Sequence, residues 1–287
     1  MHIILGGNGH VGSAIAQKLL SRGEPVTIVS RSSSSVSKWQ KLGAQVETVD
    51  VHNTVELHRV FAKGKRLFIL NPPADPATNI DIEERKSLAS ILAAVKDSGL
   101  EKIVAQSTYG AQPGNQIYDL GVLYELEQQL AAQPIPFNVI RAAYYMSNWD
   151  ASLQTAKQEG VINTFFPTNF ILPMVAPRDI GQLAASLMIE PLENIGLHNI
   201  EGPERYSSLD VAAAFAKVLQ KPVKAVETPH ERWIETIQNM GFSNEAAVSF
   251  SNMTSFTIEG EMPPCDSVTR GVISLESYIA ELVNSTL

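Results

Sequence analysis

The feature that most constrains this chain is a glycine-rich segment that begins at its sixth residue. Residues 2–5 form a short apolar run, and residues 6–12 then read Gly-Gly-Asn-Gly-His-Val-Gly. Apolar residues recur at helical spacing after this segment until Gly23, and a second apolar run covers residues 26–29. This order predicts a strand, a glycine turn, a helix and a second strand within about thirty residues.

A glycine turn in this setting predicts a dinucleotide site, whereas the same residues elsewhere could be only a flexible turn. One glycine allows the tight turn, a second lets the main chain approach a pyrophosphate, and a third lets the helix pack closely. The N–H groups at the helix start also attract phosphate. Two registers fit, with either Gly6 or Gly7 as the first glycine. The predicted contacts are Gly6, Gly7, Asn8, Gly9, His10, Val11 and Gly12.

The end of the second predicted strand favours one coenzyme over the other. A site for NAD usually has an acidic residue there, which binds the ribose 2′-hydroxyl. Here Ser30, Arg31 and Ser32 occupy this place, and no acid occurs between Pro25 and Glu47. A guanidinium can donate two hydrogen bonds to a 2′-phosphate, and a serine hydroxyl can add another. We therefore expect NADP(H) to be preferred over NAD(H); a solvated arginine in a serine-rich loop is the alternative.

Strand-like and helix-like segments continue to alternate along the first half of the chain. Segments with apolar residues at 46–49, 67–70, 103–105 and 137–140 predict strands, and helical patterns lie at 54–62, 82–96 and 120–132. This alternation predicts an α/β fold with a Rossmann-type, doubly wound parallel sheet. Ligands of such sheets bind at the carboxyl ends of the strands. The residues there that we expect to face the coenzyme are Asp50, Asn71, Pro72, Pro73 and Ser107, although two prolines can also simply end a strand.

Composition excludes several classes of function. The chain has 287 residues and a formal net charge of −8, which disfavours nucleic acid as a partner. No apolar run approaches the ~18 residues of a membrane span, and Cys265 has no second cysteine to pair with. Since no two histidines lie three or four residues apart, no metal site is predicted. We expect a soluble, cytoplasmic protein whose oligomeric state the sequence does not indicate.

Taken together, the motifs resemble those of the NmrA-like family, an atypical branch of the short-chain dehydrogenase/reductase superfamily that includes isoflavone-reductase-like and NAD(P)H:quinone reductase-type enzymes. Besides the glycines and Arg31, the matching segments are 71–73, 102–107, 140–141, 146–148, 177–181, 201–203 and 274–278. The resemblance implies an NADP(H)-binding Rossmann domain over residues 1–141 and a smaller α+β substrate-binding region over 142–287. A segment around 175–190 is expected to pack back on the first domain.

The resemblance also implies a cleft for a small conjugated or quinone-like molecule. The aromatic stretch after the sixth predicted strand would enter this cleft and provide a flat apolar wall. The candidate substrate-binding residues are Tyr144, Tyr145, Met146, Asn148 and Trp149. We expect some of these five to pack in the core instead of lining the cleft.

The catalytic residues depart from the pattern of the superfamily. Its standard mechanism uses a Tyr-x-x-x-Lys pair, but no lysine occurs between Lys102 and Lys157. If Glu127 is the glutamate of the NmrA-like reductases, Leu123 stands where their lysine would be. Tyr109 and Tyr118 are the remaining candidate proton donors. Two hypotheses follow: an NADPH-dependent reductase of a quinone or enone, or a non-enzymatic sensor that binds NADP(H) and reports to a protein partner.

Overall fold

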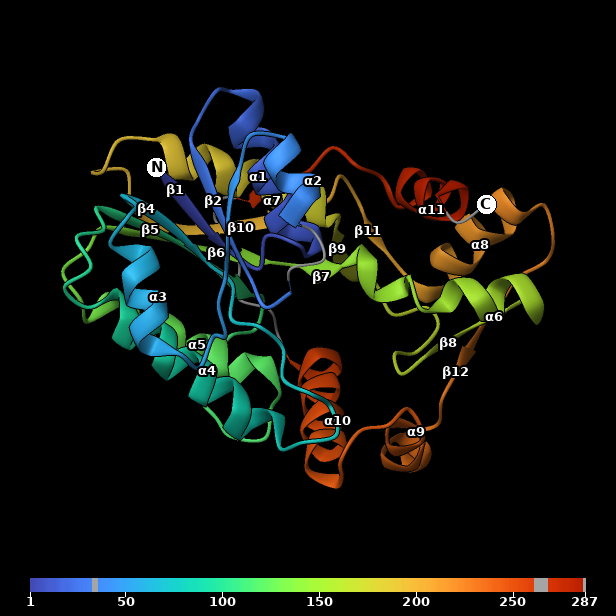
Figure 1. Cartoon of the computed structure of the whole chain (residues 1–287). Coiled ribbons are helices and arrows are strands. Elements are labelled where there is room, and N and C mark those ends of the chain that lie inside the picture. Colours follow the sequence, from blue (N-terminus) through green and yellow to red (C-terminus); the bar gives the residue numbers. More distant parts are fainter. Residues whose placement is uncertain (33–35, 261–267, 286–287) are drawn as a thin grey trace.

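The computed structural model describes residues 1–32, 36–260 and 268–285, so Cys265 lies outside the described residues. Its main feature is a sheet in which eight strands of the described chain all run parallel (Figure 1). In spatial order these are β13 (Val268–Arg270), β10 (Gly196–Glu201), β6 (Phe137–Ala142), β5 (Lys102–Thr108), β4 (Arg66–Ile69), β1 (His2–Leu5), β2 (Val26–Ser30) and β3 (Gln45–Thr48). The predicted α/β, Rossmann-type fold is confirmed.

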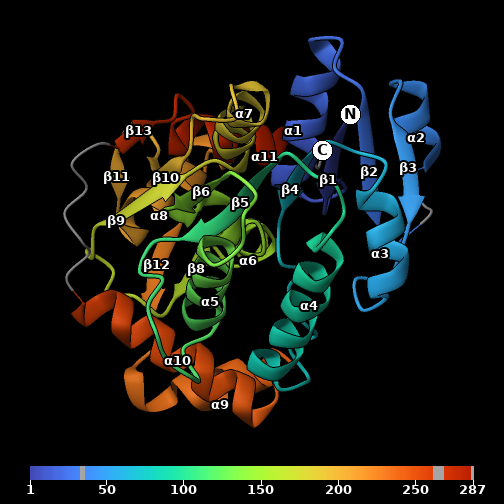
Figure 2. The same ribbon diagram turned by 90° about the vertical axis from the view of Figure 1, so that its left-hand side faces the viewer.

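Helices cover both faces of this sheet (Figure 2). One face carries α1 (His10–Ser21), α2 (Val36–Lys41) and α7 (Pro177–Ile189); the other carries α3 (Thr54–Phe61), α4 (Ile80–Val95) and α5 (Asp119–Ala131). Strand β1 shows why, since Ile4 packs on the α1 side whereas Ile3 and Leu5 pack on the α3–α5 side. Successive side chains of a strand point to opposite faces, and a sheet buried on both faces needs apolar residues at every position.

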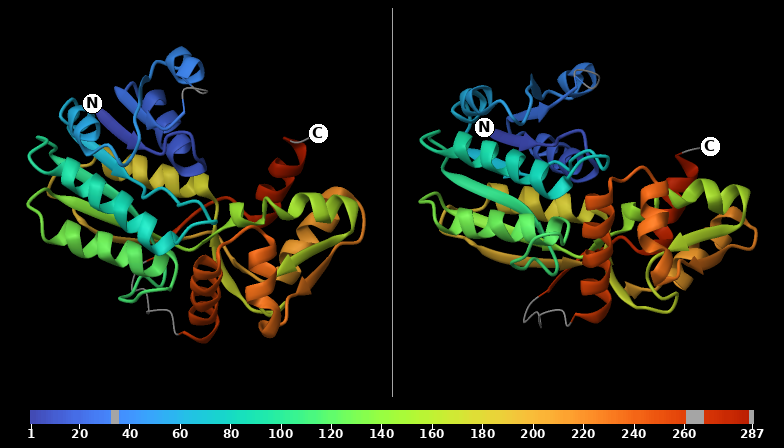
Figure 3. Two further views of the ribbon diagram at one scale, coloured as in Figure 1. Left: turned by 60° about the horizontal axis from the view of Figure 1, so that its bottom comes forward. Right: turned by 90° about the horizontal axis from the view of Figure 1, so that it is seen from below.

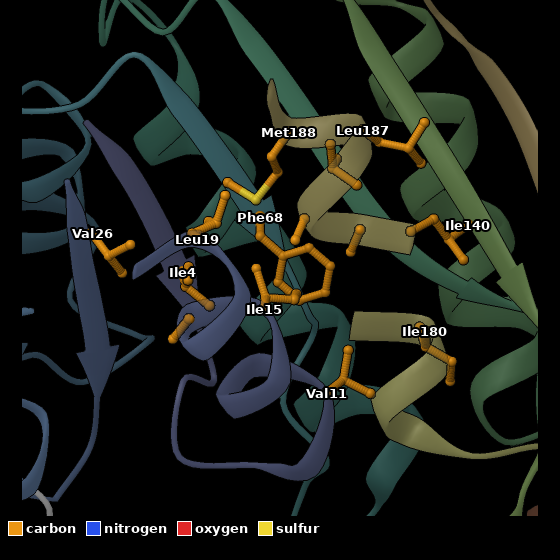
Figure 4. Packing of buried hydrophobic residues seen from close by; sticks show 14 of the residues in the cluster. Ile4, Val11, Ile15, Leu19, Val26, Phe68, Ile140, Ile180, Leu187 and Met188 are labelled. Atoms are coloured by element: carbon orange, nitrogen blue, oxygen red, sulfur yellow. The ribbon is translucent and has the colours of Figure 1, made fainter. Parts of the chain in front are cut away.

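The core on the α1 side brings together segments that are far apart in the sequence. Ile15 and Leu19 of α1 pack with Phe68 of β4 and with Leu187 and Met188 of α7 (Figure 4). A Cβ atom on Gly181 would lie 2.5 Å from the Ala14 Cβ, so the two helices approach this closely only because residue 181 has no side chain. Helix α7, from the second half of the chain, therefore packs closely against α1, the helix that follows the glycine turn.

The rest of the second half forms a smaller lobe (Figure 1). It contains α6 (Ser152–Gln158), α8 (Ser208–Leu219), α11 (Leu275–Asn284), and the paired strands β8 (Val161–Thr164) and β12 (Lys224–Glu227). Short strands β7 (Tyr144–Tyr145), β9 (Leu172–Val175) and β11 (Arg205–Tyr206) lie beside the large sheet. Helices α9 (Trp233–Asn239) and α10 (Asn244–Glu259) complete it, and α10 stands between the layer of α4 and α5 and the rest of the lobe (Figure 3).

Three features differ from the sequence prediction. Strands β10 and β13 come from the second half of the chain, yet they extend the large sheet beyond β6. Strand β12 pairs with β8 in a small sheet of its own, outside the large sheet. Helix α2 was not predicted, because a six-residue helix shows too little periodicity. None of the helices within the described ranges is both long and apolar enough to span a membrane.

Candidate coenzyme and substrate site

The glycine turn after β1 closes tightly on itself. Gly6 has a φ angle of +69°, a left-handed conformation that favours glycine, and the Gly9 N–H donates to the Gly6 carbonyl at 2.9 Å. A Cβ atom on Gly12 would lie 2.3 Å from the Gly6 oxygen and 2.9 Å from the Gly7 Cα atom. The third glycine of the motif is therefore required so that α1 can begin directly against the turn.

Gly9 is the glycine that leaves space for a ligand. It is the N-cap of α1 and provides no side-chain cap, and the first turn of α1 contains no acidic residue. A Cβ atom on Gly9 would meet only the Gly6 oxygen, at 3.4 Å, whereas one on Gly7 would lie 2.5 Å from Ile28 in the core. The uncapped N–H groups at the start of α1 are a suitable anion site. Of the other predicted contacts, Val11 packs its side chain in the core and His10 is exposed.

Asn8 supports the turn with its side chain. Its Nδ2 donates to the Ser30 hydroxyl at 2.6 Å, and its Oδ1 accepts from the Trp39 indole N–H at 2.9 Å. These two bonds connect the glycine turn to the end of β2 and to α2. Trp39 was missed by sequence reasoning because it lies on the short helix that the periodicity did not reveal.

The end of β2 presents Arg31 beside the glycine turn. Arg31 and Ser32 are exposed, and Arg31 makes no hydrogen bond or ion pair with the described residues. The neighbouring Ser30 hydroxyl accepts from the Ser32 N–H at 3.2 Å. At the end of β3, Asp50 is exposed, accepts from the His52 N–H at 2.9 Å, and lines an open hollow. A guanidinium and an open surface therefore lie on the side of the sheet where an adenosine would extend from the turn.

The loop after β4 is tied to α4 by Asn71. The Asn71 Nδ2 donates to the Glu84 carbonyl at 3.1 Å, and the Ala74 N–H donates to the Glu84 side chain at 3.2 Å. Asn71 is only 9% exposed, and its Oδ1 has no partner among the described residues. Pro72 is half-buried and Pro73 exposed. Asn71 thus fixes the loop to α4 from its buried side, while Pro72 and Pro73 lie toward the surface.

Ser107 at the end of β5 belongs to a buried polar cluster. Its hydroxyl donates to Glu127 of α5, and Arg141 of β6 donates two hydrogen bonds to the same carboxylate, at 2.8 and 2.6 Å. Both oxygens of Glu127 are therefore satisfied. The structure thus joins Ser107 to Glu127 and Arg141, which sequence reasoning had noted only separately.

The two candidate catalytic tyrosines have different surroundings. The Tyr109 hydroxyl donates to Glu201 at 3.3 Å, and Arg205 and Arg270 donate to the same carboxylate. Tyr118 precedes α5 with a φ angle of +55°, and its N–H donates to the Ser249 hydroxyl of α10 at 2.7 Å. Burial raises the pKa of Tyr118 well above its ordinary value. The role of both tyrosines as proton donors stays a prediction.

The aromatic stretch after β6 divides between core and surface. Met146 and Trp149 are buried in the core of the smaller lobe, so core packing accounts for these two of the five candidates. Tyr144 is half-buried against Trp149 and Phe166, and burial raises its pKa to about 12. Tyr145 is half-buried and Asn148 is exposed. The candidates that retain accessible surface are therefore Tyr144, Tyr145 and Asn148.

The family model for the NmrA-like family matches residues 2–278, which is nearly the whole chain. The chain belongs to the NmrA-like family. Among curated relatives, an NAD(P)H azoreductase of Xenophilus azovorans is 20% identical over 260 residues, covering 88% of this chain and 86% of the relative.

Two solved structures share the fold of this NmrA-like protein. Triphenylmethane reductase of Citrobacter sp. complexed with NADP(H) has a TM-score of 0.77 at 20% identity, covering 100% of this chain and 99% of that one. The NADPH-dependent quinone oxidoreductase of Escherichia coli complexed with NADPH has a TM-score of 0.76 at 17% identity, covering 99% and 100%.

The NmrA-like protein has an apolar side chain at the position where the family resemblance implied a lysine. Leu123 packs against the core between α3–α5 and the sheet, beside residues such as Leu126 and Val122. A leucine side chain carries no proton that it could donate. Any proton donor in this protein must therefore come from other residues.

Proposed function

We propose that this protein binds NADPH and reduces a small planar acceptor such as a quinone or an enone. The observation that carries the proposal is the glycine turn. Gly12 must lack a side chain because α1 packs directly against the turn, whereas a Cβ atom on Gly9 would meet only the Gly6 oxygen, so the turn is open beside Gly9. A structural turn would need the first feature but not the second. When bound, NADPH would supply the hydride.

The residues present fit such a coenzyme. The uncapped start of α1 would accept the pyrophosphate, and Arg31 would donate to the 2′-phosphate from the end of β2. Tyr144, Tyr145 and Asn148 would border the acceptor, since these members of the aromatic stretch retain exposed surface. The reductase names of the azoreductase and quinone oxidoreductase relatives support hydride transfer as the chemistry.

The preference for NADPH is tested by the variant Arg31→Ala. A hydrogen bond to a charged group contributes about 1.5–3 kcal/mol, so the ratio of NADH to NADPH dissociation constants should fall by roughly 10–100-fold. Arg22→Ala removes another exposed arginine, at the end of α1, and serves as the matched control. An unchanged ratio in Arg31→Ala would contradict the proposal.

Turnover is tested by following NADPH absorbance with a panel of quinones and enones. Consumption above the uncatalysed rate supports the reductase. The alternative, a sensor that binds NADP(H) without turnover, is favoured by the absence of a lysine partner for either tyrosine. Tight NADPH binding with no consumption across the panel would establish that alternative.

A further inference from the structure

One side chain of the glycine-rich segment reaches the smaller lobe. His10, the first residue of α1, has its Nε2 3.9 Å from the Oδ2 of Asp150. Asp150 directly follows the short helix η2 (Met146–Trp149), which contains the exposed acceptor candidate Asn148. The contact therefore joins the start of α1, where we place the pyrophosphate, to the segment where we place the acceptor. We call it the His10–Asp150 contact.

Asp150 is fixed by its other neighbours, whereas His10 is not. The Tyr278 hydroxyl of α11 donates to Asp150 Oδ1 at 2.9 Å, and the Asp150 N–H donates to the Ser147 carbonyl at 3.1 Å. The side chain of Asp150 is 27% exposed and that of His10 is 66% exposed. A carboxylate held in this way can orient an imidazole, and an exposed imidazole exchanges its proton readily with water.

Two opposing charges act on the His10 imidazole. The start of α1 carries the partial positive charge of a helix N-terminus, and its first turn contains no acidic residue. This charge disfavours the imidazolium form of His10, whereas the Asp150 carboxylate favours it. Farther along α11, Glu281 accepts from Arg178 of α7 at 3.1 Å, so its charge is compensated. The balance between Asp150 and the helix terminus therefore decides the protonation of His10.

A bound pyrophosphate would change this balance. Its negative charge would lie against the N–H groups at the start of α1 and offset the partial positive charge of the helix. The pyrophosphate and Asp150 would then both favour the imidazolium, which can donate a hydrogen bond to each because both of its ring nitrogens carry a proton. The present separation of 3.9 Å is too long for a hydrogen bond, so a small rotation of the exposed imidazole would complete the contact.

We propose that coenzyme binding protonates His10 and converts the His10–Asp150 contact into an ion pair, an inference that rests on the proposed coenzyme site. The only covalent change is the transfer of one proton from water to the imidazole. The ion pair fixes Asp150, and with it the segment 146–150, relative to the coenzyme. His10 and Asp150 are thus positioning residues, which prepare the acceptor site once the coenzyme is bound.

The first test counts protons with NADP+, which carries no hydride to transfer. Isothermal titration calorimetry in buffers of different ionisation enthalpy measures the protons taken up on binding. Near neutral pH the wild type should take up more protons than His10→Gln. On lowering the pH from about 8 to about 6, the Kd of the wild type should fall by roughly tenfold more than that of His10→Gln, because a charge-assisted hydrogen bond is gained. The difference from the variant is the quantity to use, since a phosphate monoester titrates in the same range.

Two further variants control this measurement. His230→Gln removes an exposed histidine of η3 (His230–Arg232) and should take up as many protons as the wild type. Asp150→Asn retains an acceptor for the Tyr278 hydroxyl but removes the charge, so it should take up fewer protons near neutral pH. Equal proton uptake by the wild type and His10→Gln would overturn the proposal.

The second test detects the fixing of the acceptor segment. Hydrogen exchange of the main-chain N–H groups of residues 146–150 should slow when NADP+ binds the wild type, but not when it binds His10→Gln. Unchanged exchange in the wild type, or equal slowing in the variant, would overturn the proposal. If NADP+ binds without these effects, the inference fails and the proposed coenzyme site stands. If NADP+ neither produces heat nor raises the Tm, the coenzyme site and the inference fail together.

Discussion

The turn between β1 and α1 allows a sharp separation of folding from coenzyme binding, because two of its glycines differ in what surrounds them. In Gly12→Ala the new methyl would lie 2.3 Å from the Gly6 oxygen, 2.7 Å from the Gly6 carbonyl carbon and 2.9 Å from the Gly7 Cα atom. All three are main-chain atoms, so no side chain can rotate to relieve the contact. Overpacking of this kind typically costs about 1–3 kcal/mol.

The matching variant, Gly9→Ala, should leave stability unchanged. Gly9 has a φ of −78° and a ψ of 172°, which an alanine adopts without strain, and its methyl would meet only the Gly6 oxygen, at 3.4 Å. The same methyl would occupy the open side of the turn, where we place the pyrophosphate. Wild-type protein with NADPH at 100 times its Kd gains about 2.7 kcal/mol, and Gly9→Ala should lose most of this gain.

Thermal melts with and without NADPH measure both effects. Since 1 kcal/mol shifts the Tm of domains near this size by about 2–4 °C, Gly12→Ala should melt several degrees lower even without coenzyme. Gly9→Ala should melt like the wild type alone but show little increase with NADPH. A wild-type Tm for Gly12→Ala would refute the packing argument. A full NADPH shift for Gly9→Ala would remove Gly9 from the coenzyme surface.

Three further predictions follow from buried polar groups. Arg141→Ala should lower stability by about 3–5 kcal/mol in urea unfolding, because it leaves the buried Glu127 carboxylate without its cation; a wild-type midpoint would contradict this. Asp179→Ala should lower stability by about 1–3 kcal/mol and increase proteolysis near residue 272, because Asp179 accepts from the Val272 and Ile273 N–H groups, both at 3.0 Å; unchanged proteolysis would argue against that role. Burial raises the pKa of Glu84 to about 7 in the folded state. The folded state therefore binds more protons than the unfolded state, and the free energy of unfolding should fall as the pH rises from about 4.5 to 7. Glu84→Gln should reduce that fall by about 1–3 kcal/mol, and parallel pH profiles of variant and wild type would refute the assignment.

Periodicity and glycine spacing were sufficient for the first half of the fold, because those signals are local. A strand buried on both faces must be apolar, as β1 illustrates. A helix can begin directly against a turn only where the residue in contact lacks a side chain, as Gly12 illustrates. The strands β1 to β6 therefore lie close to their predicted ranges. The resemblance to the NmrA-like family likewise rested on short motifs, and the match over residues 2–278 confirmed it.

Tertiary structure alone decided how the second half completes the first. Strand β10 joins the sheet beside β6 through contacts between residues more than fifty positions apart in the chain. The packing of α7, which the family resemblance had implied, has α1 as its partner only in the folded protein. The sequence of a strand or helix shows which of its faces is apolar, but it does not show which other element packs on that face. No local pattern therefore reveals such pairings. The same reason hid the burial of Glu84: in the sequence it looks like an ordinary helix residue, and only the packing of α4 against the loop after β4 takes its carboxyl away from water.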